Sequence, residues 1–200
     1  MRVLIACEFS GVVRDAFLKQ GHDAWSCDLL PTESPGPHYQ GCIFDFLLTR
    51  PDWDLMIGHP PCTYLCSSGI HWNAKKPERK RLTYEALDFF KCLLAFRHIP
   101  MRAIENPIGI ASTWIRKPDQ YIQPYEYGHP ESKRTCLWLE GLPPLEPTNV
   151  LPLPETGRWD NQTASGQNRL GPSPDRWKLR SLTYPGIAEA MATQWGALHP

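Results

Sequence analysis

The stretch RVLIACEFSGVVRDAFLKQGHDAWSCD (residues 2–28) decides the fold class. Its pattern predicts a buried strand over 2–7, a short turn, and a helix over 12–20. Gly21 is placed to stop that helix, because glycine readily adopts the left-handed conformation that often ends one. A second strand is expected over 23–27. Strand, helix and strand in this order favour two parallel strands joined by a helical crossover.

The same alternation continues along the chain. Apolar runs predict further strands at 54–57, 101–104 and 135–139, and further helices at 83–97 and 186–195. Residues 29–41, 68–83 and 141–180 are expected to form loops. The alternation predicts an α/β fold in which a parallel sheet carries helices on its faces.

Composition narrows the class of protein. The 200 residues suffice for one domain, and 21 basic and 21 acidic side chains give no net charge, so overall charge does not indicate nucleic acid. No apolar run is long enough to cross a bilayer and no signal peptide is recognisable, so we expect a cytoplasmic location with reduced thiols. Four of the seven cysteines are expected to be small core residues: Cys7, Cys27, Cys92 and Cys136.

Four reactive side chains follow predicted strands: Glu8, Asp28, Cys62 and Glu105. In a parallel sheet the carboxyl ends of the strands meet at one edge, where ligands bind. Cys62 follows two prolines, which end the strand and hold the thiol at a rigid exit from the sheet. A cysteine in this setting favours a nucleophile over a core side chain, and His59 is an alternative base beside it.

Glu105 opens the segment Glu105-Asn106-Pro107, directly after an apolar strand. A carboxylate there is costly unless it is paired or used. Partial burial predicts a raised pKa, and therefore a carboxyl group that can donate a proton. The alternative is a structural ion pair.

The turn Glu8-Phe9-Ser10-Gly11 joins the first strand to the first helix. Its small residues let a ligand approach the backbone, and the helix N-terminus supplies free amides. The spacing is not that of a dinucleotide-binding motif. Asp28 is placed to accept hydrogen bonds from ribose hydroxyls. The alternatives are an ordinary strand–turn–helix and a capping or turn role for Asp28.

Basic residues gather in three places that predict contacts with phosphate: Lys75 to Arg81 beside Trp72, Lys133-Arg134, and Arg176 to Arg180. The alternative is a solvated surface loop.

The order of these motifs resembles the DNA cytosine-5 methyltransferases, most of all the short forms encoded by bacteriophages and prophages. The resemblance rests on Glu-Phe-Ser-Gly at 8–11, Asp28, Pro-Pro-Cys at 60–62 and Glu-Asn-Pro at 105–107, and it covers residues 3 to about 195. It implies a Rossmann-like methyltransferase sheet that binds S-adenosylmethionine. It also implies a DNA partner, a bacterial host cytoplasm and a link to restriction and modification.

The resemblance also assigns roles. Cys62 would attack C6 of a flipped cytosine, Glu105 would protonate N3, and Lys133 would assist catalysis. The residues implied to contact S-adenosylmethionine are Glu8, Phe9, Ser10, Gly11, Asp28, Asp45 and Pro61. The residues implied to contact DNA are Ser68, Trp72, Lys75, Lys76, Arg79 and Arg134.

The chain departs from the pattern of the family in four places. Thr63 stands where glutamine is common, Cys42 where an aspartate is usual, and Ile187 where an asparagine closes the last motif. The basic motif usually holds two arginines, and here Lys133 and Thr135 stand at their positions. The expected organisation is a catalytic core over 1–140, a reduced target-recognition segment over 141–182, and a C-terminal helix over 183–200 that packs back on the core. Neither a metal, a membrane nor an obligatory protein partner is expected.

Three other functions are alternatives to this prediction. A zinc-dependent nucleobase deaminase needs H-x-E upstream of P-C-x-x-C, but this chain has P-C-x-x-x-C from Pro61 and no H-x-E upstream of it. An adenine amino-methyltransferase would carry Asp-Pro-Pro-Tyr where this chain has His59-Pro60-Pro61-Cys62. A DNA-binding protein that no longer catalyses is the alternative from a different class.

Overall fold

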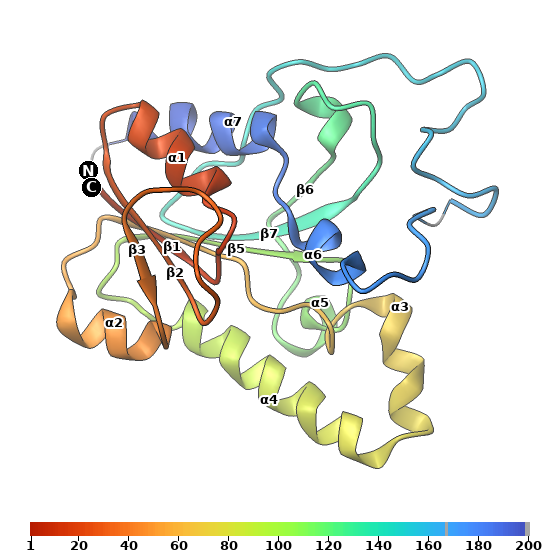
Figure 1. Cartoon of the computed structure of the whole chain (residues 1–200), viewed down its shortest axis with the longest axis horizontal. Coiled ribbons are helices and arrows are strands. Elements are labelled where there is room, and N and C mark those ends of the chain that lie inside the picture. The colour runs from red at the N-terminus through yellow and green to blue at the C-terminus, as the bar shows by residue number, and fades with distance from the viewer. Residues whose placement is uncertain (167, 199–200) are drawn as a thin grey trace.

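The computed structural model describes residues 1–166 and 168–198, and Figure 1 shows one mixed sheet between two layers of helices. Residue 167 of the predicted 141–182 segment and residues 199–200 of the predicted 183–200 helix segment lie outside the described residues. The strand order is β3-β2-β1-β4-β5-β7-β6. The strands are β1 (Arg2–Ala6), β2 (Asp23–Asp28), β3 (His38–Gln40), β4 (Leu55–Gly58), β5 (Met101–Pro107), β6 (Gln120–Ile122) and β7 (Thr135–Glu140).

Strands β1 to β5 pair in parallel, whereas β7 runs antiparallel to both β5 and β6. The α/β fold with a sheet between helices is therefore confirmed, but the sheet is mixed where an all-parallel one was expected. The connection from β5 to β7 explains the difference. It contains no long crossover helix, and β6 and β7 follow as a short antiparallel pair.

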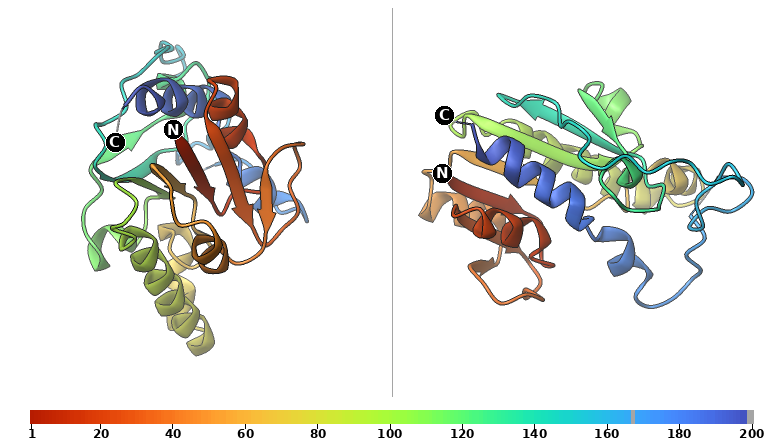
Figure 2. Two further views of the ribbon diagram at one scale, coloured as in Figure 1. Left: turned by 90° about the vertical axis from the view of Figure 1, so that its left-hand side faces the viewer. Right: turned by 90° about the horizontal axis from the view of Figure 1, so that it is seen from above.

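Figure 2 shows helices α1 (Val12–Lys19) and α7 (Pro185–Gly196) on one face of the sheet and α2 (Ile43–Thr49) and α4 (Pro77–Leu94) on the other. Alternate residues of β1 supply both cores. Val3 and Ile5 pack with α1 and α7, while Leu4 and Ala6 pack with α2 and α4. Burial on both faces explains why the strand is apolar throughout.

The shorter elements are α3 (Ser67–Ile70), η1 (His71–Ala74), α5 (Ala111–Trp114), η2 (Pro124–Glu126) and α6 (Arg176–Ser181). No helix in the described part of the chain has the length and apolar character needed to span a membrane.

The loop predicted over 68–83 was wrong, because α3 and η1 fill its first half and α4 begins at Pro77. Proline favours the first position of a helix, where its fixed φ fits and its missing N–H is not needed. The basic residues that follow Pro77 are good helix formers, so Arg79, Lys80 and Arg81 belong to α4, whereas Lys75 and Lys76 precede it. The core assignment of Cys92 was also wrong, since Cys92 is exposed on that helix.

Arg14 of α1 organises the loop between β2 and β3. Its side chain is fully buried, and the guanidinium donates hydrogen bonds to Ser26 of β2 (3.1 Å), to Thr32 (3.2 Å) and to the carbonyl of Ser34 (2.9 Å). It also pairs with Asp15 at 2.8 Å. Because all of these bonds come from one buried cation, the loop after Asp28 depends on Arg14.

Gly11 leaves room for this cation. Its φ is +78°, and a Cβ there would lie 2.5 Å from Arg14 Nη2. Gly11 is therefore needed both for the left-handed backbone and for the space beside the guanidinium.

Replacing Arg14 with methionine should lower the free energy of unfolding by about 3 kcal/mol, because several buried hydrogen-bond partners lose their donor. Urea unfolding measures the change, and hydrogen exchange should show faster exchange in residues 29–37. The exposed Arg158→Met substitution is the matched control and should change stability by less than about 0.5 kcal/mol. An equally small effect of Arg14→Met would contradict this account.

Candidate functional site

The candidate site lies where the strand order reverses. Strand β2 lies on one side of β1 and β4 on the other, which makes the carboxyl edge between β1 and β4 the switch point where ligands bind in such sheets. Glu8 follows β1, Asp28 ends β2, and Glu105 comes one residue after the last β5 residue paired with β4. Cys62 follows β4 by four residues. The four predicted side chains therefore lie along one edge of the sheet.

Asn106 fixes the position of the cysteine loop. Its buried amide donates a 2.7 Å hydrogen bond to the carbonyl of Pro60, which ties the end of β5 to the Pro-Pro segment. The carbonyl of Cys62 accepts hydrogen bonds from the amides of Leu65 and Cys66, each at 3.0 Å. The half-buried thiol is thereby held in a turn close to Glu105, while Pro61 is exposed at the surface.

The pKa of Cys62 lies above the ordinary value of 9.0. Burial is the main cause, and the charges of Cys66 and Glu105 act in the same direction. Arg180 and Lys133 lower the pKa but do not outweigh burial. In this state Cys62 is a protonated thiol, so activation of a nucleophile needs a further lowering of its pKa when a ligand binds.

Glu105 does not have the raised pKa that the sequence predicted. Burial does raise its pKa, but the hydrogen bond and charge of His59 and the charge of Lys133 outweigh burial, so that the pKa falls below its usual value. Nδ1 of His59 lies 3.2 Å from Oε2 of Glu105. Glu105, which the sequence predicted to be a proton donor, is therefore ionised. Its charged form is stabilised by His59, which lies 46 residues earlier in the chain.

Glu8 is held at the N-terminus of α1. Its carboxylate accepts hydrogen bonds from the amides of Val13 (2.7 Å) and Arg14 (3.2 Å), and its side chain is buried. It therefore caps the N-terminus of α1 and does not point into open space. The pKa of Glu8 is raised by burial, against the charge of His59 and these two amides.

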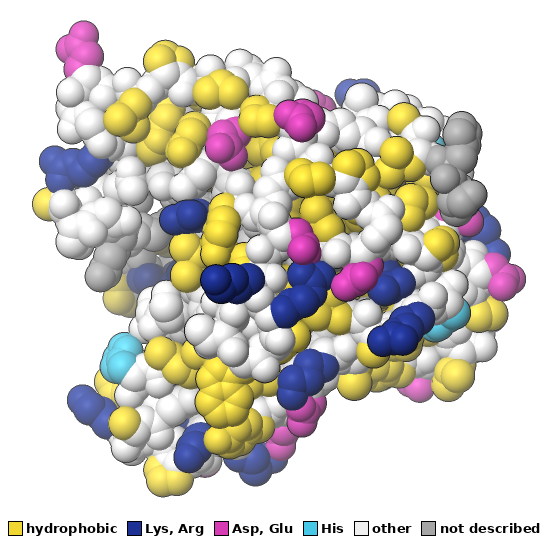
Figure 3. Space-filling model, turned by 180° about the vertical axis from the view of Figure 1, so that it is seen from behind, with side chains coloured by type: hydrophobic (Ala, Val, Ile, Leu, Met, Phe, Trp, Pro, Cys, Tyr) yellow, Lys and Arg dark blue, Asp and Glu magenta, His cyan; other side chains and the backbone are white. Residues whose placement is uncertain are grey.

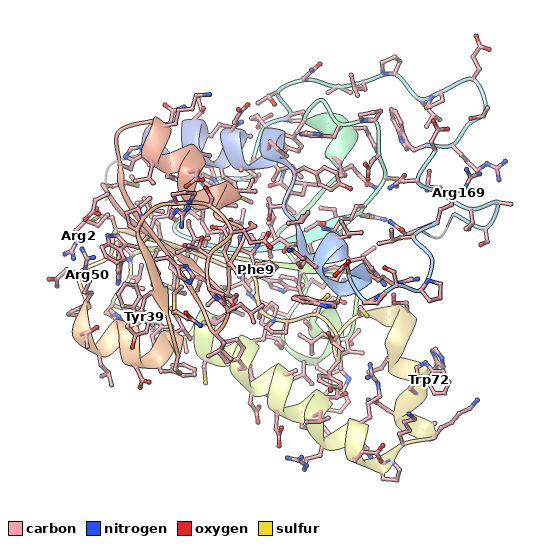
Figure 4. All side chains as sticks on the ribbon, viewed as in Figure 1. Arg2, Phe9, Tyr39, Arg50, Trp72 and Arg169 are labelled. Atoms are coloured by element: carbon pink, nitrogen blue, oxygen red, sulfur yellow. The ribbon has the colours of Figure 1, made fainter. Side chains whose placement is uncertain are left out.

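Phe9 lies in the turn after β1, and Asp28 is the last residue of β2. The ring of Phe9 packs on Trp177 of α6 with centroids 5.8 Å apart, and Figure 4 shows Phe9 in the middle of the molecule beside that helix. Asp28 is half-buried, with a pKa raised by burial, and it accepts a hydrogen bond from the amide of Leu30. Leu29 and Leu30 are 74% and 40% exposed, so an apolar surface lies beside the carboxylate.

Ser10 and Asp45 contribute differently to this part of the site. The Ser10 hydroxyl donates a hydrogen bond to Glu8 at 3.3 Å and accepts one from the amide of Val12. Asp45 is exposed in the first turn of α2, and no hydrogen bond or ion pair joins its side chain to another site residue within the described part of the chain. The structure therefore brings Ser10 to the turn but does not join Asp45 to it.

The predicted basic loop forms an arm made of α3, η1 and the start of α4, which projects away from the sheet in Figure 1. Trp72 is 45% exposed and carries Lys75 and Lys76 over its ring, at 5.4 and 5.8 Å from the centroid. Figure 4 places Trp72 far from Phe9, near the end of the arm. Ser68 is exposed near the start of the arm.

The side chain of Arg79 makes contacts within the protein. Its guanidinium donates a 2.6 Å hydrogen bond to the carbonyl of Thr63 and lies 4.8 Å from the ring centroid of Tyr64. It therefore ties the arm to the loop that carries Cys62.

The second basic segment divides between two environments. Lys133 donates to the carbonyl of Leu182 at 3.0 Å and lines a cavity of about 20 Å³ with Glu105, which is space for one water molecule. Arg134 is exposed and packs over the ring of Tyr121 at 4.3 Å. Lys133 thus belongs to the carboxylate site and Arg134 to the surface.

Sequence reasoning missed the contribution of α6 and understated that of His59. Trp177 covers Phe9, Lys178 pairs with Glu33, and Arg180 lies close enough to influence the Cys62 thiol. The basic run 176–180 was visible in the sequence, but nothing in it predicted a place opposite β1 and β4. The proximity of His59 to Cys62 in sequence was the signal available for His59.

Comparison with models of known protein families gives no match for this chain, and comparison with curated proteins gives none either. Within residues 1–166 and 168–198, no group of three or more His, Cys, Asp or Glu side chains is placed to hold a metal ion.

Replacing Glu105 with glutamine should make Cys62 more reactive towards iodoacetamide at pH 8, by roughly two- to tenfold. The reason is that removal of a neighbouring negative charge lowers the pKa of the thiol. Peptide mass spectrometry after timed alkylation gives the rate, and exposed Cys92 is the internal control. A Cys62 rate that is unchanged or slower in Glu105→Gln would show that the two groups do not interact.

Proposed function

We propose that this protein transfers a methyl group from S-adenosylmethionine to C5 of cytosine in DNA. The observation that carries the proposal is the meeting of the Cys62 thiol and the Glu105 carboxylate at the switch point of the sheet, with Lys133 beside both. A thiol and a carboxylate close to each other suit addition to a pyrimidine ring, which needs a soft nucleophile at one ring atom and a proton at another.

The edge beside β1 and β2 has the groups that S-adenosylmethionine requires. Asp28 offers a carboxylate to ribose hydroxyls, and Leu29 and Leu30 offer exposed apolar surface to a base. The turn that ends at Gly11 presents backbone close to the edge. When bound, S-adenosylmethionine supplies an electrophilic methyl group on a sulfonium. Glu8 supports this turn from within, through its bonds to the amides of α1.

In the proposed reaction, the first bond is formed by the sulfur atom of Cys62. The Cys62 thiol gives its proton to solvent and the thiolate forms a bond to C6 of cytosine. The electrons moved into the ring make C5 nucleophilic, while N3 takes a proton from solvent by way of Glu105. After C5 has gained the methyl group and lost its proton, the bond from C6 to sulfur breaks. Lys133 and Arg180 stabilise negative charge near the thiolate. A base within a duplex must first be flipped out of the stack.

The arm supplies a surface for the phosphate backbone. Trp72, Lys75 and Lys76 combine an exposed aromatic ring with two ammonium groups, and Arg134 with Tyr121 forms a second such pair. Figure 3, which views the molecule from behind Figure 1, shows Lys and Arg side chains spread among hydrophobic ones on that face. DNA contact therefore rests on local groups, in keeping with a net charge of zero.

A Cys62→Ala variant should lose methyl transfer by at least about 10³-fold, because the covalent route depends on this thiol. Its affinity for S-adenosylmethionine should stay within about twofold. Labelled methyl transfer to DNA followed by nucleoside analysis measures the rate and identifies the product, and Cys92→Ala is the control. N6-methyladenine as the product, or 5-methylcytosine made at a normal rate by Cys62→Ala, would refute the proposed mechanism.

A Lys75→Ala/Lys76→Ala double variant should bind DNA more weakly and with less dependence on salt. The slope of log affinity against log salt concentration should become shallower by about 1–2. The reason is that DNA binding releases fewer counterions when fewer phosphates are contacted. Fluorescence anisotropy across a salt series measures this slope. Lys19→Ala, on the far end of α1, is the matched control. A slope equal to that of the unchanged protein would remove the arm from the DNA surface.

A further inference from the structure

Helix α6 is held against the candidate site on both sides of Arg180. Before Arg180, the ring of Trp177 packs on Phe9 in the turn after β1, with ring centroids 5.8 Å apart. After Arg180, Thr183 lines the small cavity that also borders Glu105. Arg180 is in the last turn of the helix and therefore lies along the sheet edge, between the turn after β1 and the Glu105 carboxylate.

The neighbouring cations are engaged within the protein, whereas Arg180 is not. Arg176 donates a hydrogen bond to a backbone carbonyl, and Lys178 forms an ion pair with Glu33. Lys133 donates to the backbone just after α6. Arg180 is exposed, and its guanidinium makes no hydrogen bond or ion pair with any residue in the described part of the chain. Its donors are therefore available to a ligand.

This guanidinium lies within electrostatic reach of the proposed nucleophile. Its positive charge acts to lower the pKa of the Cys62 thiol, an effect that burial of the thiol outweighs. A guanidinium carries five N–H donors in a planar fork, which matches two oxygen atoms of a phosphate. An arginine with free donors beside a reactive group thus fits an anion that belongs to the substrate.

The proposed reaction identifies that anion. The sulfur of Cys62 attacks C6 of cytosine, and in an anti pyrimidine nucleotide C6 is the ring atom turned toward the 5′-phosphate. A cation beside the sulfur is therefore on the same side of the nucleotide as the 5′-phosphate, whereas the 3′-phosphate lies beyond the sugar. We propose that Arg180 binds the 5′-phosphate of the nucleotide whose base reacts with Cys62. This inference rests on the proposed function.

This contact differs from the DNA contacts assigned to the arm. Lys75 and Lys76 are assigned to phosphates along the duplex, where such contacts add affinity without regard to sequence. Arg180 instead holds the nucleotide that has left the stack, so that its ring is oriented with C6 toward the sulfur. Arg180 therefore contributes to the orientation of the base as well as to affinity.

A neutral phosphate analogue tests this contact in DNA. Once sequencing of the methylated product has located a target cytosine, a methylphosphonate on its 5′ side removes the charge of that phosphate. In the unchanged protein this replacement should slow methyl transfer about tenfold to a hundredfold, because a charge-assisted hydrogen bond is lost. In Arg180→Gln it should change the rate by less than about threefold, since the partner of the phosphate is already absent.

Two controls separate this role from a general loss of positive charge. A methylphosphonate on the 3′ side of the target should slow both proteins by the same factor. Arg97→Gln, exposed near the start of β5 at the opposite edge of the sheet, should respond to the 5′ replacement as the unchanged protein does. If Arg180 acts on the Cys62 thiol alone, the 5′ replacement will slow Arg180→Gln as much as the unchanged protein, and the inference is wrong.

A binding measurement without turnover separates this inference from the proposed function. Deoxycytidine 5′-monophosphate should protect Cys62 from iodoacetamide at a concentration at least about fivefold lower than the 3′-monophosphate requires, although both carry the same base and charge. In Arg180→Gln the two concentrations should agree within about twofold. Protection is the ratio of alkylation rates with and without nucleotide, so a change in the pKa of the thiol cancels.

The outcomes of this measurement are distinct. Equal protection by the two nucleotides in the unchanged protein, or no protection by either, would overturn the inference. A preference for the 5′-nucleotide that persists in Arg180→Gln would assign the phosphate to another group and contradict it as well. If Arg180 selects the 5′-nucleotide but the protein makes no 5-methylcytosine in DNA, the proposed function fails and the phosphate site stands.

Discussion

The candidate site depends on one constraint, which is the parallel pairing of β1 with β2 on one side and β4 on the other. Parallel strands end at the same edge, so side chains that are far apart in sequence meet there. Asp28 and Cys62 flank the turn after β1, and Glu105 follows from the pairing of β4 with β5. The hydrogen bond from Asn106 to Pro60 then fixes how closely the two reactive strand ends approach.

Electrostatics within this edge sets the resting state of the site. Burial keeps the Cys62 thiol protonated, while His59 and Lys133 keep Glu105 ionised against the same effect of burial. Both reactive groups are therefore held in the protonation state opposite to the one that cytosine addition uses. A ligand that supports this chemistry therefore has to change the protonation of both groups.

Local patterns predicted a large part of the fold, and contacts between distant segments determined the rest. The order β1, α1, β2 could be predicted because its signals are local in the sequence. These signals are the spacing of the apolar residues and the glycine, Gly21, that ends the helix. The strand β3 spans three residues and exists through pairing with β2, so its own sequence carried little signal. The sign of the Glu105 pKa shift was missed for the same reason, since it depends on His59 of another strand end. The capping role of Glu8 became visible once α1 was placed above it.

The most direct test of the central claim is a search for a covalent bond between Cys62 and cytosine. Fluorine at C5 replaces the proton whose loss releases the enzyme, so DNA that contains 5-fluorocytosine should trap the adduct. With S-adenosylmethionine present, mass spectrometry should find one complex of protein, DNA and a single methyl group, with the bond mapped to Cys62. Methylation of ordinary DNA without any trapped adduct, or an adduct mapped to another cysteine, would contradict the account.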